Sequence, residues 1–313
     1  MALKEKILVT GGAGFIGSHL IDHLVFQGHE VVALDDFATG LALNLAEHRG
    51  QVQLIEGSVA DPAVLEKALK GVKIVYHLAA IASVQASVEN PLKTHEVGTT
   101  GTLILLDRAV KAGVRRLVFA GSSSAYGRPA EEIQTETTPL EPLSPYAASK
   151  LAGEMYCKAF SHSFTLETVI LRFFNVFGPR QRPDSPYSGV IALFAKALKD
   201  SKAPTIFGDG LQTRDFVFVS DVVRCLYLAS QKPGISGDVF HVGTGQSTNL
   251  WQLLEVLNRV LGLAIEAKTG PARAGDVRHS CANIEKTRQM LGWSPTVSFE
   301  DGIRSTTQWM AQS

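Results

Sequence analysis

A tyrosine and a lysine four residues apart, Tyr146 and Lys150, have the types and spacing of a catalytic pair. The segment from Ser144 to Lys150 leads into a predicted helix, on which a spacing of four places both side chains on one face. An ammonium group beside a phenol favours the phenolate and lowers the pKa of the phenol toward neutrality. Such a phenolate is suited to act as a general base for an alcohol that undergoes oxidation.

The N-terminal segment indicates where a redox partner would bind. Gly11, Gly14 and Gly17 follow a short apolar run and precede a helical pattern. This strand, glycine turn and helix form the context of a dinucleotide fingerprint, in which backbone N–H groups face a pyrophosphate. A second apolar run ends in Asp35, 18 residues after Gly17. A carboxylate there suits the ribose hydroxyls of NAD and repels the 2′-phosphate of NADP, so the sequence predicts bound NAD.

Two further segments place polar groups after predicted strands. Val118-Phe-Ala-Gly runs into the hydroxyl-rich turn Ser122-Ser-Ser124, and an apolar run from Leu171 ends at Asn175. In a parallel sheet the carboxyl ends of the strands open onto the ligand crevice. Serine is also an ordinary turn residue, so the hydroxyl turn alone assigns no chemistry.

The elements that must position these residues alternate through the first half of the chain, which predicts an α/β fold with a doubly wound parallel sheet. Predicted strands cover 6–10, 30–34, 52–55, 73–77, 116–120 and 167–171, and predicted helices cover 15–27, 62–70, 91–112 and 145–162. Apolar pieces at 216–219 and 239–242 suggest a return to this sheet. We expect a nucleotide-binding domain over 1–178, rejoined near 213–245, and a smaller, interleaved substrate-binding domain mainly over 179–313.

Composition narrows the class of partner. Of the 313 residues, 45% are hydrophobic, and 30 basic residues balance 30 acidic ones, so no overall field recruits nucleic acid or an anionic membrane. The three cysteines are far apart and show neither a metal-ligand spacing nor a disulfide framework. The chain enters its first strand without a secretory segment and has no apolar run of membrane-spanning length. These features predict a cytoplasmic, metal-free protein.

In the order of its motifs the chain resembles the extended short-chain dehydrogenase/reductases that act on nucleotide-sugars. Within them it is most similar to the UDP-hexose 4-epimerases, of both the UDP-glucose and the UDP-N-acetylglucosamine types. The motifs are Thr10-Gly-Gly-Ala-Gly-Phe-Ile-Gly17, His77-Leu-Ala-Ala80, Ser122-Ser-Ser-Ala-Tyr-Gly127, Tyr146-x-x-x-Lys150, Arg172-Phe-Phe-Asn-Val-Phe-Gly178, Gly208-Asp-Gly-x-x-x-Arg-Asp-Phe216, Arg273-Ala-Gly-Asp276 and Leu291-Gly-Trp-Ser-Pro295. The resemblance implies a Rossmann fold, bound NAD, a UDP-sugar substrate and a homodimer joined through helices near 91–112 and 147–162.

The resemblance also implies residue roles. Tyr146 would take the proton of the sugar 4-hydroxyl, Lys150 would bind the nicotinamide ribose, and Ser122 would be the catalytic hydroxyl. The implied cofactor contacts are Gly11, Gly14, Phe15, Ile16, Gly17, Asp35, Asp36, Ser58, Val59, Leu78, Ala79, Ala80, Tyr146, Lys150 and Phe173. The implied substrate contacts are Ser124, Asn175, Val190, Arg182, Arg214, Arg273, Asp276 and Ser280.

Three departures from the family pattern stand out. Ser58 replaces an Asp that reads adenine, Gly98 replaces an Asn, and Asn283 replaces an acid. Related 4,6-dehydratases carry Asp-Glu after the catalytic hydroxyl, where this chain has Ser123 and Ser124. Serines do not perform that acid and base chemistry, which favours epimerisation over dehydration.

Two residues bear on the choice of sugar. Ser280 is small at a position where enzymes restricted to non-acetylated sugars tend to have Tyr, so N-acetylated sugars are expected to fit. Arg182 falls where the UDP-glucuronate 4-epimerases place an arginine against the sugar carboxylate, which leaves that activity as an alternative. A reductase of the same fold, or a catalytically inactive NAD-binding sensor or scaffold, would also fit these motifs.

Overall fold

The computed structural model describes residues 4–182, 189–272 and 277–312. The chain divides into two interleaved compact units. The first unit comprises Met1–Ala125, Pro142–Arg172 and Val223–Phe240, and the second comprises Tyr126–Glu141, Phe173–Val222 and His241–Ser313. Assigning nucleotide binding to 1–178 and sugar binding mainly to 179–313 stays a proposal about function.

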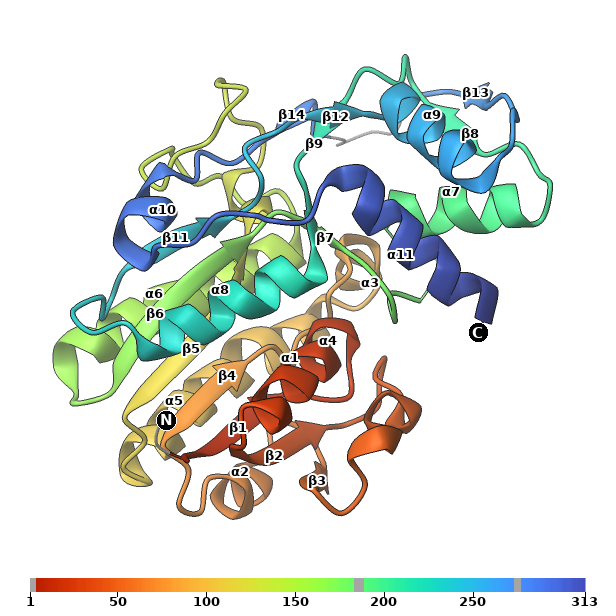
Figure 1. The fold of residues 1–313 in the computed structure, drawn as a ribbon. Coiled ribbons are helices and arrows are strands. Elements are labelled where there is room, and N and C mark those ends of the chain that lie inside the picture. Colours follow the sequence, from red (N-terminus) through yellow and green to blue (C-terminus); the bar gives the residue numbers. More distant parts are fainter. Residues whose placement is uncertain (1–3, 183–188, 273–276, 313) are drawn as a thin grey trace. The chain divides into compact units, whose positions relative to one another are not determined.

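The main sheet has the strand order β11-β6-β5-β4-β1-β2-β3 (Figure 1). Its strands are β1 (Lys6–Thr10), β2 (Glu30–Asp35), β3 (Val52–Glu56), β4 (Ile74–His77), β5 (Arg116–Ser122), β6 (Glu167–Phe173) and β11 (Val239–Val242). The pairs from β3 to β5 are parallel, and the chain reverses its winding direction between β1 and β4. This is the doubly wound order with its crevice at the β1/β4 switch point, which confirms the expected fold class.

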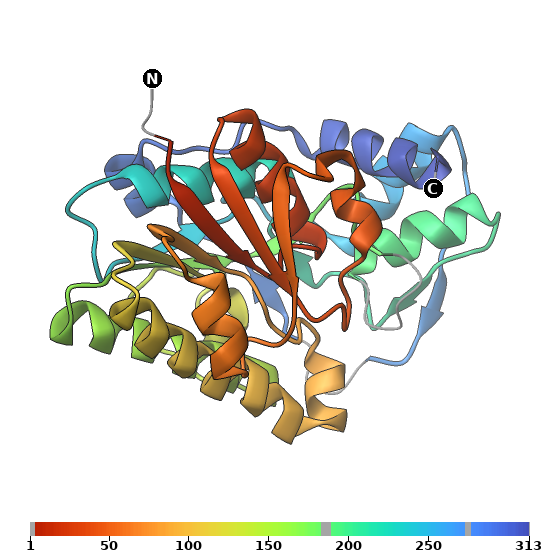
Figure 2. The same ribbon diagram turned by 90° about the horizontal axis from the view of Figure 1, so that it is seen from below.

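Helices cover both faces of this sheet (Figure 2). The helical elements of this part of the chain are α1 (Phe15–Phe26), η1 (Ala42–His48), α2 (Pro62–Ala68), α3 (Val84–Glu89), α4 (Pro91–His95), η2 (Glu96–Thr100), α5 (Gly101–Lys111), η3 (Ser123–Tyr126), α6 (Pro145–Ser163) and α8 (Val219–Gln231). Leu65, Leu105 and Cys157, from α2, α5 and α6, share one core with Leu8 and Val32 of the sheet. No helix within the described ranges has the length and apolar character needed to cross a bilayer.

The two apolar pieces expected to return to the sheet behave differently. β11 joins its edge, and Ile170 of β6 donates to the Asp238 carbonyl just before β11. The piece at 216–219 instead forms β10 (Phe216–Phe218), which pairs with β7 (Asn175–Phe177) in a separate sheet. Expecting it in the main sheet was therefore wrong, because periodicity identifies a buried strand but not its neighbour.

The second unit has its own small sheets and core. Its other strands are β8 (Thr205–Phe207), β9 (Thr213–Arg214), β12 (Thr248–Asn249), β13 (Lys268–Gly270) and β14 (His279–Ser280), and its helices are α7 (Val190–Lys199), α9 (Leu250–Leu261), α10 (Glu285–Leu291) and α11 (Phe299–Gln312). Phe194 of α7, Leu253 of α9 and Ile303 of α11 pack into one apolar cluster. This core supports the short strands that carry the predicted substrate residues.

Candidate active site

The start of α6 fixes the predicted catalytic pair. Ser144 caps the helix by accepting from the Ala147 N–H at 3.1 Å, and proline occupies the first turn, where it suits a helix start. Further along, Gly153 lies against Phe119 of β5, and a Cβ on Gly153 would come within 2.6 Å of that ring. The missing side chain lets α6 pack closely on the sheet.

Lys150 uses this close packing to reach the sheet backbone. Its Nζ donates to the Ala120 carbonyl at 2.8 Å and lies 5.2 Å from the centre of the Phe119 ring. Burial lowers the pKa of Lys150 to about 8. The side chain is thus cationic near neutral pH and held at the carboxyl end of β5.

The Tyr146 phenol has a pKa above its usual value, because burial disfavours the phenolate. A hydrogen bond from the Ser122 hydroxyl opposes this rise. The expectation that Lys150 brings the pKa toward neutrality is therefore wrong for the protein alone. The physical reason is that the Lys150 ammonium is directed to Ala120 and burial dominates at the phenol.

The hydroxyl turn at the end of β5 brings two of the predicted residues together. The Ser124 hydroxyl donates to Ser122 Oγ at 2.8 Å, and the Ser124 N–H donates to the same oxygen at 3.2 Å. The Ser122 hydroxyl in turn opposes the rise in the pKa of the Tyr146 phenol. Ser122, Tyr146 and Lys150 are all in the first unit, close to the carboxyl edge of its sheet.

The glycine turn after β1 has the shape needed for a pyrophosphate. Gly11 has a φ of +69°, and a Cβ there would lie 2.9 Å from the Ala79 nitrogen. A Cβ on Gly17 would lie 2.1 Å from the Gly11 carbonyl oxygen, so the turn closes only with glycine. Helix α1 begins at Phe15 after Gly14, and no side chain caps it in the described structure. Its first N–H groups, including those of Phe15 and Ile16, suit an anion.

Asp35, at the end of β2, is 7% exposed, and both of its oxygens accept backbone hydrogen bonds. Oδ2 accepts from the Ala13 N–H and Oδ1 accepts from the Phe37 N–H, each at 2.9 Å. Burial raises the pKa of Asp35, and these bonds oppose the rise. Each oxygen keeps a lone pair for a ribose hydroxyl. The neighbouring Asp36 is exposed and accepts from the Ala38 N–H at 3.1 Å. The chain therefore fits NAD at this edge.

His77 ends β4 inside a chain of hydrogen bonds. Thr102 donates to the Gly98 carbonyl at 2.7 Å, so its oxygen must accept the Nε2–H of His77, at 2.9 Å. The His77 Nδ1 then accepts from Thr10, 2.7 Å away, and Thr10 accepts from the Ala79 N–H. The network links the start of the glycine turn to the loop after β4. Burial lowers the pKa of His77 to about 3, so the imidazole is neutral.

This burial predicts an acid-sensitive fold. Unfolded His77 has an ordinary pKa near 6.5, so below that pH the unfolded chain binds a proton that the folded chain refuses. The contribution of His77 to stability is complete above pH 6.5 and falls by about 1.4 kcal/mol per pH unit toward pH 3. His77→Asn offers both an acceptor and a donor but does not titrate. Urea unfolding should show a shallower acid loss for this variant, and parallel pH profiles would contradict the prediction.

Ser58 and Gly98 are two of the positions at which this chain departs from the family pattern. The Ser58 hydroxyl accepts from the Ala60 N–H at 3.2 Å, in the turn before α2. Gly98 lies in the π-helical turn η2, where a Cβ would come within 2.8 Å of Ser149 Oγ. A side chain at Gly98 would therefore meet α6 next to Lys150. Val59 and Phe173 are buried and Leu78, Ala79 and Ala80 are partly buried.

Three predicted substrate residues come together in the second unit. Ser280 of β14 is the register partner of Arg214 of β9. Asn175 begins β7 beside Phe216 of β10, and its side-chain amide donates to the Asp215 carbonyl at 3.3 Å. These side chains thus follow adjoining strands and are all partly buried.

The other predicted substrate positions are less informative. Val190 begins α7 and is partly buried, while Arg182 is exposed. Ser124 belongs to the first unit, unlike most of this group. Arg273 and Asp276 lie outside the described residues.

Asp215 is a residue whose importance the sequence reasoning missed. It is fully buried, and its carboxylate accepts from the backbone of Thr244, Gly245 and Ala282 and from the Thr244 hydroxyl. The carboxylate thereby ties β9 and β10 to the strand end that carries Ser280. The signal was available, because an acid directly before the apolar β10 enters the core with its strand and must find hydrogen-bond donors there.

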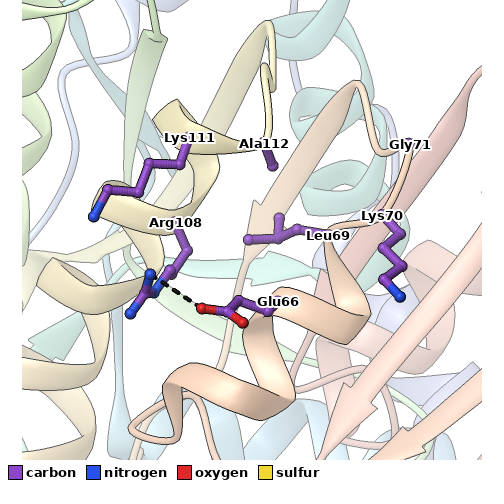
Figure 3. Close-up of a pocket in the computed structure, with 7 residues that line it drawn as sticks. All are labelled: Glu66, Leu69, Lys70, Gly71, Arg108, Lys111 and Ala112. Carbon is purple, nitrogen blue, oxygen red and sulfur yellow. Dashed lines mark ion pairs between the residues drawn. The ribbon is translucent and has the colours of Figure 1, made fainter.

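One hollow in the first unit contains none of the predicted site residues (Figure 3). It has a volume of about 360 Å³ and is lined by Glu66, Leu69, Lys70, Gly71, Arg108, Lys111 and Ala112. Two of its cations are paired, Arg108 with Glu66 at 3.1 Å and Lys111 with Asp107 at 2.7 Å. The pair between Arg108 and Glu66 fastens α5 to α2, so we assign the hollow a structural role.

Comparison with known proteins identifies the family to which this geometry belongs. Residues 7–243 match the model of the NAD dependent epimerase/dehydratase family. The UDP-glucose 4-epimerase of Mycolicibacterium smegmatis is 40% identical over 309 residues, with 97% of this chain and 98% of that protein covered. The Thermus thermophilus UDP-glucose 4-epimerase in complex with NAD superposes with a TM-score of 0.90 at 37% identity, covering 98% of this chain and 99% of that chain.

A third similar protein is named for an N-acetylated sugar. The UDP-N-acetylglucosamine 4-epimerase from Methanobrevibacter ruminantium, in complex with UDP-N-acetylmuramic acid, superposes with a TM-score of 0.94 at 35% identity over 99% of both chains. The expected resemblance and the NAD dependence are confirmed by these matches. The chain belongs to the NAD-dependent epimerase/dehydratase family.

Proposed function

We propose that this protein inverts the configuration at C4 of a UDP-hexose through a 4-keto intermediate. The observation that carries the proposal is the buried Lys150 one helical turn after Tyr146, held at the carboxyl end of β5 by its bond to the Ala120 carbonyl, with the Ser122 hydroxyl at the end of the same strand. This group lies on the same unit as the glycine turn and Asp35, the features that fit NAD. The similar proteins named above add support, because their names include UDP-glucose and UDP-N-acetylglucosamine 4-epimerases.

In this mechanism Tyr146 removes the proton of the sugar 4-hydroxyl, and Ser122 stabilises the phenolate oxygen by donating to it. Lys150 adds a positive charge at the same edge and would hold the nicotinamide ribose. When bound, NAD supplies a reversible acceptor for the C4 hydride. The keto sugar would turn about its diphosphate, and Tyr146 would return the proton to the C4 oxygen of the inverted sugar.

Substrate binding falls to the second unit in this proposal. Asn175 and Arg214 would hold the diphosphate, because an arginine fork suits phosphate oxygens. Arg273 and Asp276 would add contacts to the phosphates and the uridine ribose. Ser280 beside Arg214 would form a wall of the sugar pocket. Its small side chain favours UDP-glucose, UDP-galactose and the N-acetylated UDP-hexosamines together.

The direct test is a panel of UDP-sugars. Purified protein should release a dinucleotide without a 2′-phosphate on denaturation, and should interconvert C4 epimers of UDP-glucose and UDP-N-acetylglucosamine. Turnover of UDP-glucuronate alone would favour the alternative in which Arg182 meets the sugar carboxylate. Bound NAD with no turnover of any sugar would favour the sensor or scaffold.

We also propose that the protein is a cytoplasmic homodimer. Apolar side chains on α3, α4 and α6 remain exposed, with Val88 62%, Leu92 81% and Met155 42% exposed. Exposed apolar patches of this kind mark protein interfaces. The expected helix over 91–112 is divided into α4, η2 and α5, and Leu105 and Leu106 of α5 are core residues. Within that segment the proposed face therefore comes from α4. The three cysteines are buried and free, in keeping with a reducing compartment.

Leu92→Glu should convert the dimer into a monomer near 33.7 kDa, because a charge would be buried without a partner in the interface. Sedimentation at micromolar concentration measures this. Phe26→Glu is the matched control, since Phe26 on α1 is 86% exposed and lies on another helix. A monomeric parent, or equal dissociation of both variants, would rule out this interface.

A further inference from the structure

The segment of backbone that carries Ser280 is held along both of its edges. On one edge the Ser280 carbonyl accepts from the Asp215 N–H at 2.9 Å, and the Ala282 N–H donates to the Asp215 carboxylate at 3.1 Å. On the other edge both the N–H and the carbonyl of Cys281 bond to Gln134. All of these residues belong to the second unit. The segment therefore has two supports, of which Gln134 is one.

Gln134 forms its support first with its backbone. Its N–H donates to the Cys281 carbonyl at 2.8 Å, and its carbonyl accepts from the Asn283 N–H at 2.8 Å. This is the bonding of a single parallel bridge, between Gln134 and Ala282. In a regular parallel ladder, the next bond would join the Cys281 N–H to the carbonyl of Glu132, two residues before Gln134.

The side-chain amide of Gln134 takes the place of that next bond. Its Oε1 accepts from the Cys281 N–H at 3.0 Å, and its Nε2 donates to the carbonyls of Glu131 at 2.9 Å and Glu132 at 3.2 Å. Gln134 is 1% exposed and Cys281 is also buried, so water does not reach this N–H. Because a buried N–H without a partner is costly, the amide keeps the Cys281 backbone in place.

The other contacts between this loop and its neighbours do not hold the same segment. Glu132 Oε1 lies 3.9 Å from His279 Nε2, and the Glu132 side chain is exposed, so this ion pair contributes little. Glu136 accepts from the His241 N–H at 3.2 Å, which ties the loop to β11. Among the described contacts, the bonds to Cys281 and Asn283 that support the segment after β14 come from Gln134.

We propose that Gln134 is a positioning residue that fixes the Ser280 wall of the sugar pocket. The inference rests on the proposed function, in which the size of the side chain at this wall decides which sugars fit. A wall excludes a bulky group only if its backbone does not yield to that group. With bonds on both edges, the segment has no free edge toward which it can shift. Gln134 thus acts on sugar choice through Ser280, without touching the sugar.

The test is the coupling between Gln134 and Ser280 in the choice of sugar. Ser280→Tyr should lower kcat/KM for UDP-N-acetylglucosamine by about 10²-fold relative to UDP-glucose. Adding Gln134→Ala should recover about tenfold of this loss, because the released segment yields to the acetamido group. Gln134→Ala alone should keep the ratio within about twofold of the parent, since the serine presses on neither sugar. Competition assays with both sugars measure each ratio.

Two further variants separate this role from a general effect on folding. Gln134→Met fills a similar volume without the amide, so it should reproduce the alanine result, and it replaces the alanine variant if that variant does not fold. Gln289→Ala is the matched control, because Gln289 on α10 is exposed and donates to Glu285. It should leave the ratio of Ser280→Tyr unchanged. No recovery in the double variant, with equal further losses on both sugars, would overturn the proposal.

Binding measurements distinguish this proposal from the proposed function. Titration calorimetry on the same variants gives dissociation constants for UDP-glucose and for both N-acetylated C4 epimers, and it requires no turnover. If the parent epimerises no sugar, the proposed function fails, while a recovery of affinity for the acetylated sugars still supports the role of Gln134. If Ser280→Tyr changes neither the affinities nor the turnover ratio, Ser280 forms no wall and the role of Gln134 is refuted.

Discussion

Tyr146→Phe should reduce epimerisation by about 10²- to 10⁴-fold, the usual effect of losing a general base. The substitution removes one oxygen from a partly buried ring at the start of α6 and leaves the ring packing intact. Ser122 keeps both of its hydrogen bonds from Ser124, so the substitution does not threaten the fold. Steady-state turnover of a UDP-sugar, together with thermal unfolding and the content of bound NAD, measures the three parts of this expectation.

Tyr156→Phe is the control for this substitution. Tyr156 lies on the same helix but is 37% exposed and belongs to none of the hydrogen-bond networks described above. It should keep parental turnover. If Tyr146→Phe retained turnover within a few-fold of the parent, Tyr146 could not be the base. A loss of bound NAD in the same variant would mean that its effect comes from cofactor binding.

The fold was largely predictable because its signals are local. Apolar runs such as those of β1 and β2, followed by a glycine turn or an acid, mark buried parallel strands in any sequence. The partner of a strand depends on distant residues, and periodicity does not contain that information. In the structure β11, and not β10, lies beside β6. On the neighbouring strand β5, the buried Arg116 donates to the carbonyl oxygens at the end of α8. A buried arginine has no sequence signature that distinguishes it from a surface one.

The candidate site was predictable in its residue types but not in its electrostatics. The spacing of Tyr146 and Lys150 gives their common helix face, but not the direction of the Lys150 ammonium or the burial of the phenol. Gly98 illustrates the same limit. In the sequence, Gly98 only shows that the amide side chain of the family motif is missing. In the structure, the Ser149 side chain of α6 lies where a side chain on Gly98 would be. Steric relations of this kind join residues that are far apart in the sequence, so they can be seen only in the folded structure.

The second large expected effect concerns substrate choice. Ser280→Tyr should lower kcat/KM for UDP-N-acetylglucosamine by about 10²-fold relative to UDP-glucose, a discrimination within the range that pocket shape provides. Ser280 lies on β14 beside Arg214, in a strand whose backbone is fixed by the bond from the Asp215 N–H to the Ser280 carbonyl at 2.9 Å. A phenol ring at this place would meet the acetamido group in one of the two orientations that the keto sugar must adopt.

Ser280→Ala separates bulk from hydrogen bonding in this experiment. It removes the hydroxyl without filling the pocket, so it should cost only a few-fold on the acetylated sugar, in line with about 1 kcal/mol for one neutral hydrogen bond. The backbone bond from Asp215 persists in both variants, which keeps β14 in register. Competition assays with both sugars in one reaction give the ratio of kcat/KM directly. Equal losses on the two sugars in Ser280→Tyr would show that Ser280 does not line the sugar pocket. A larger side chain in the pocket wall would exclude the acetylated sugar more strongly than the smaller UDP-glucose.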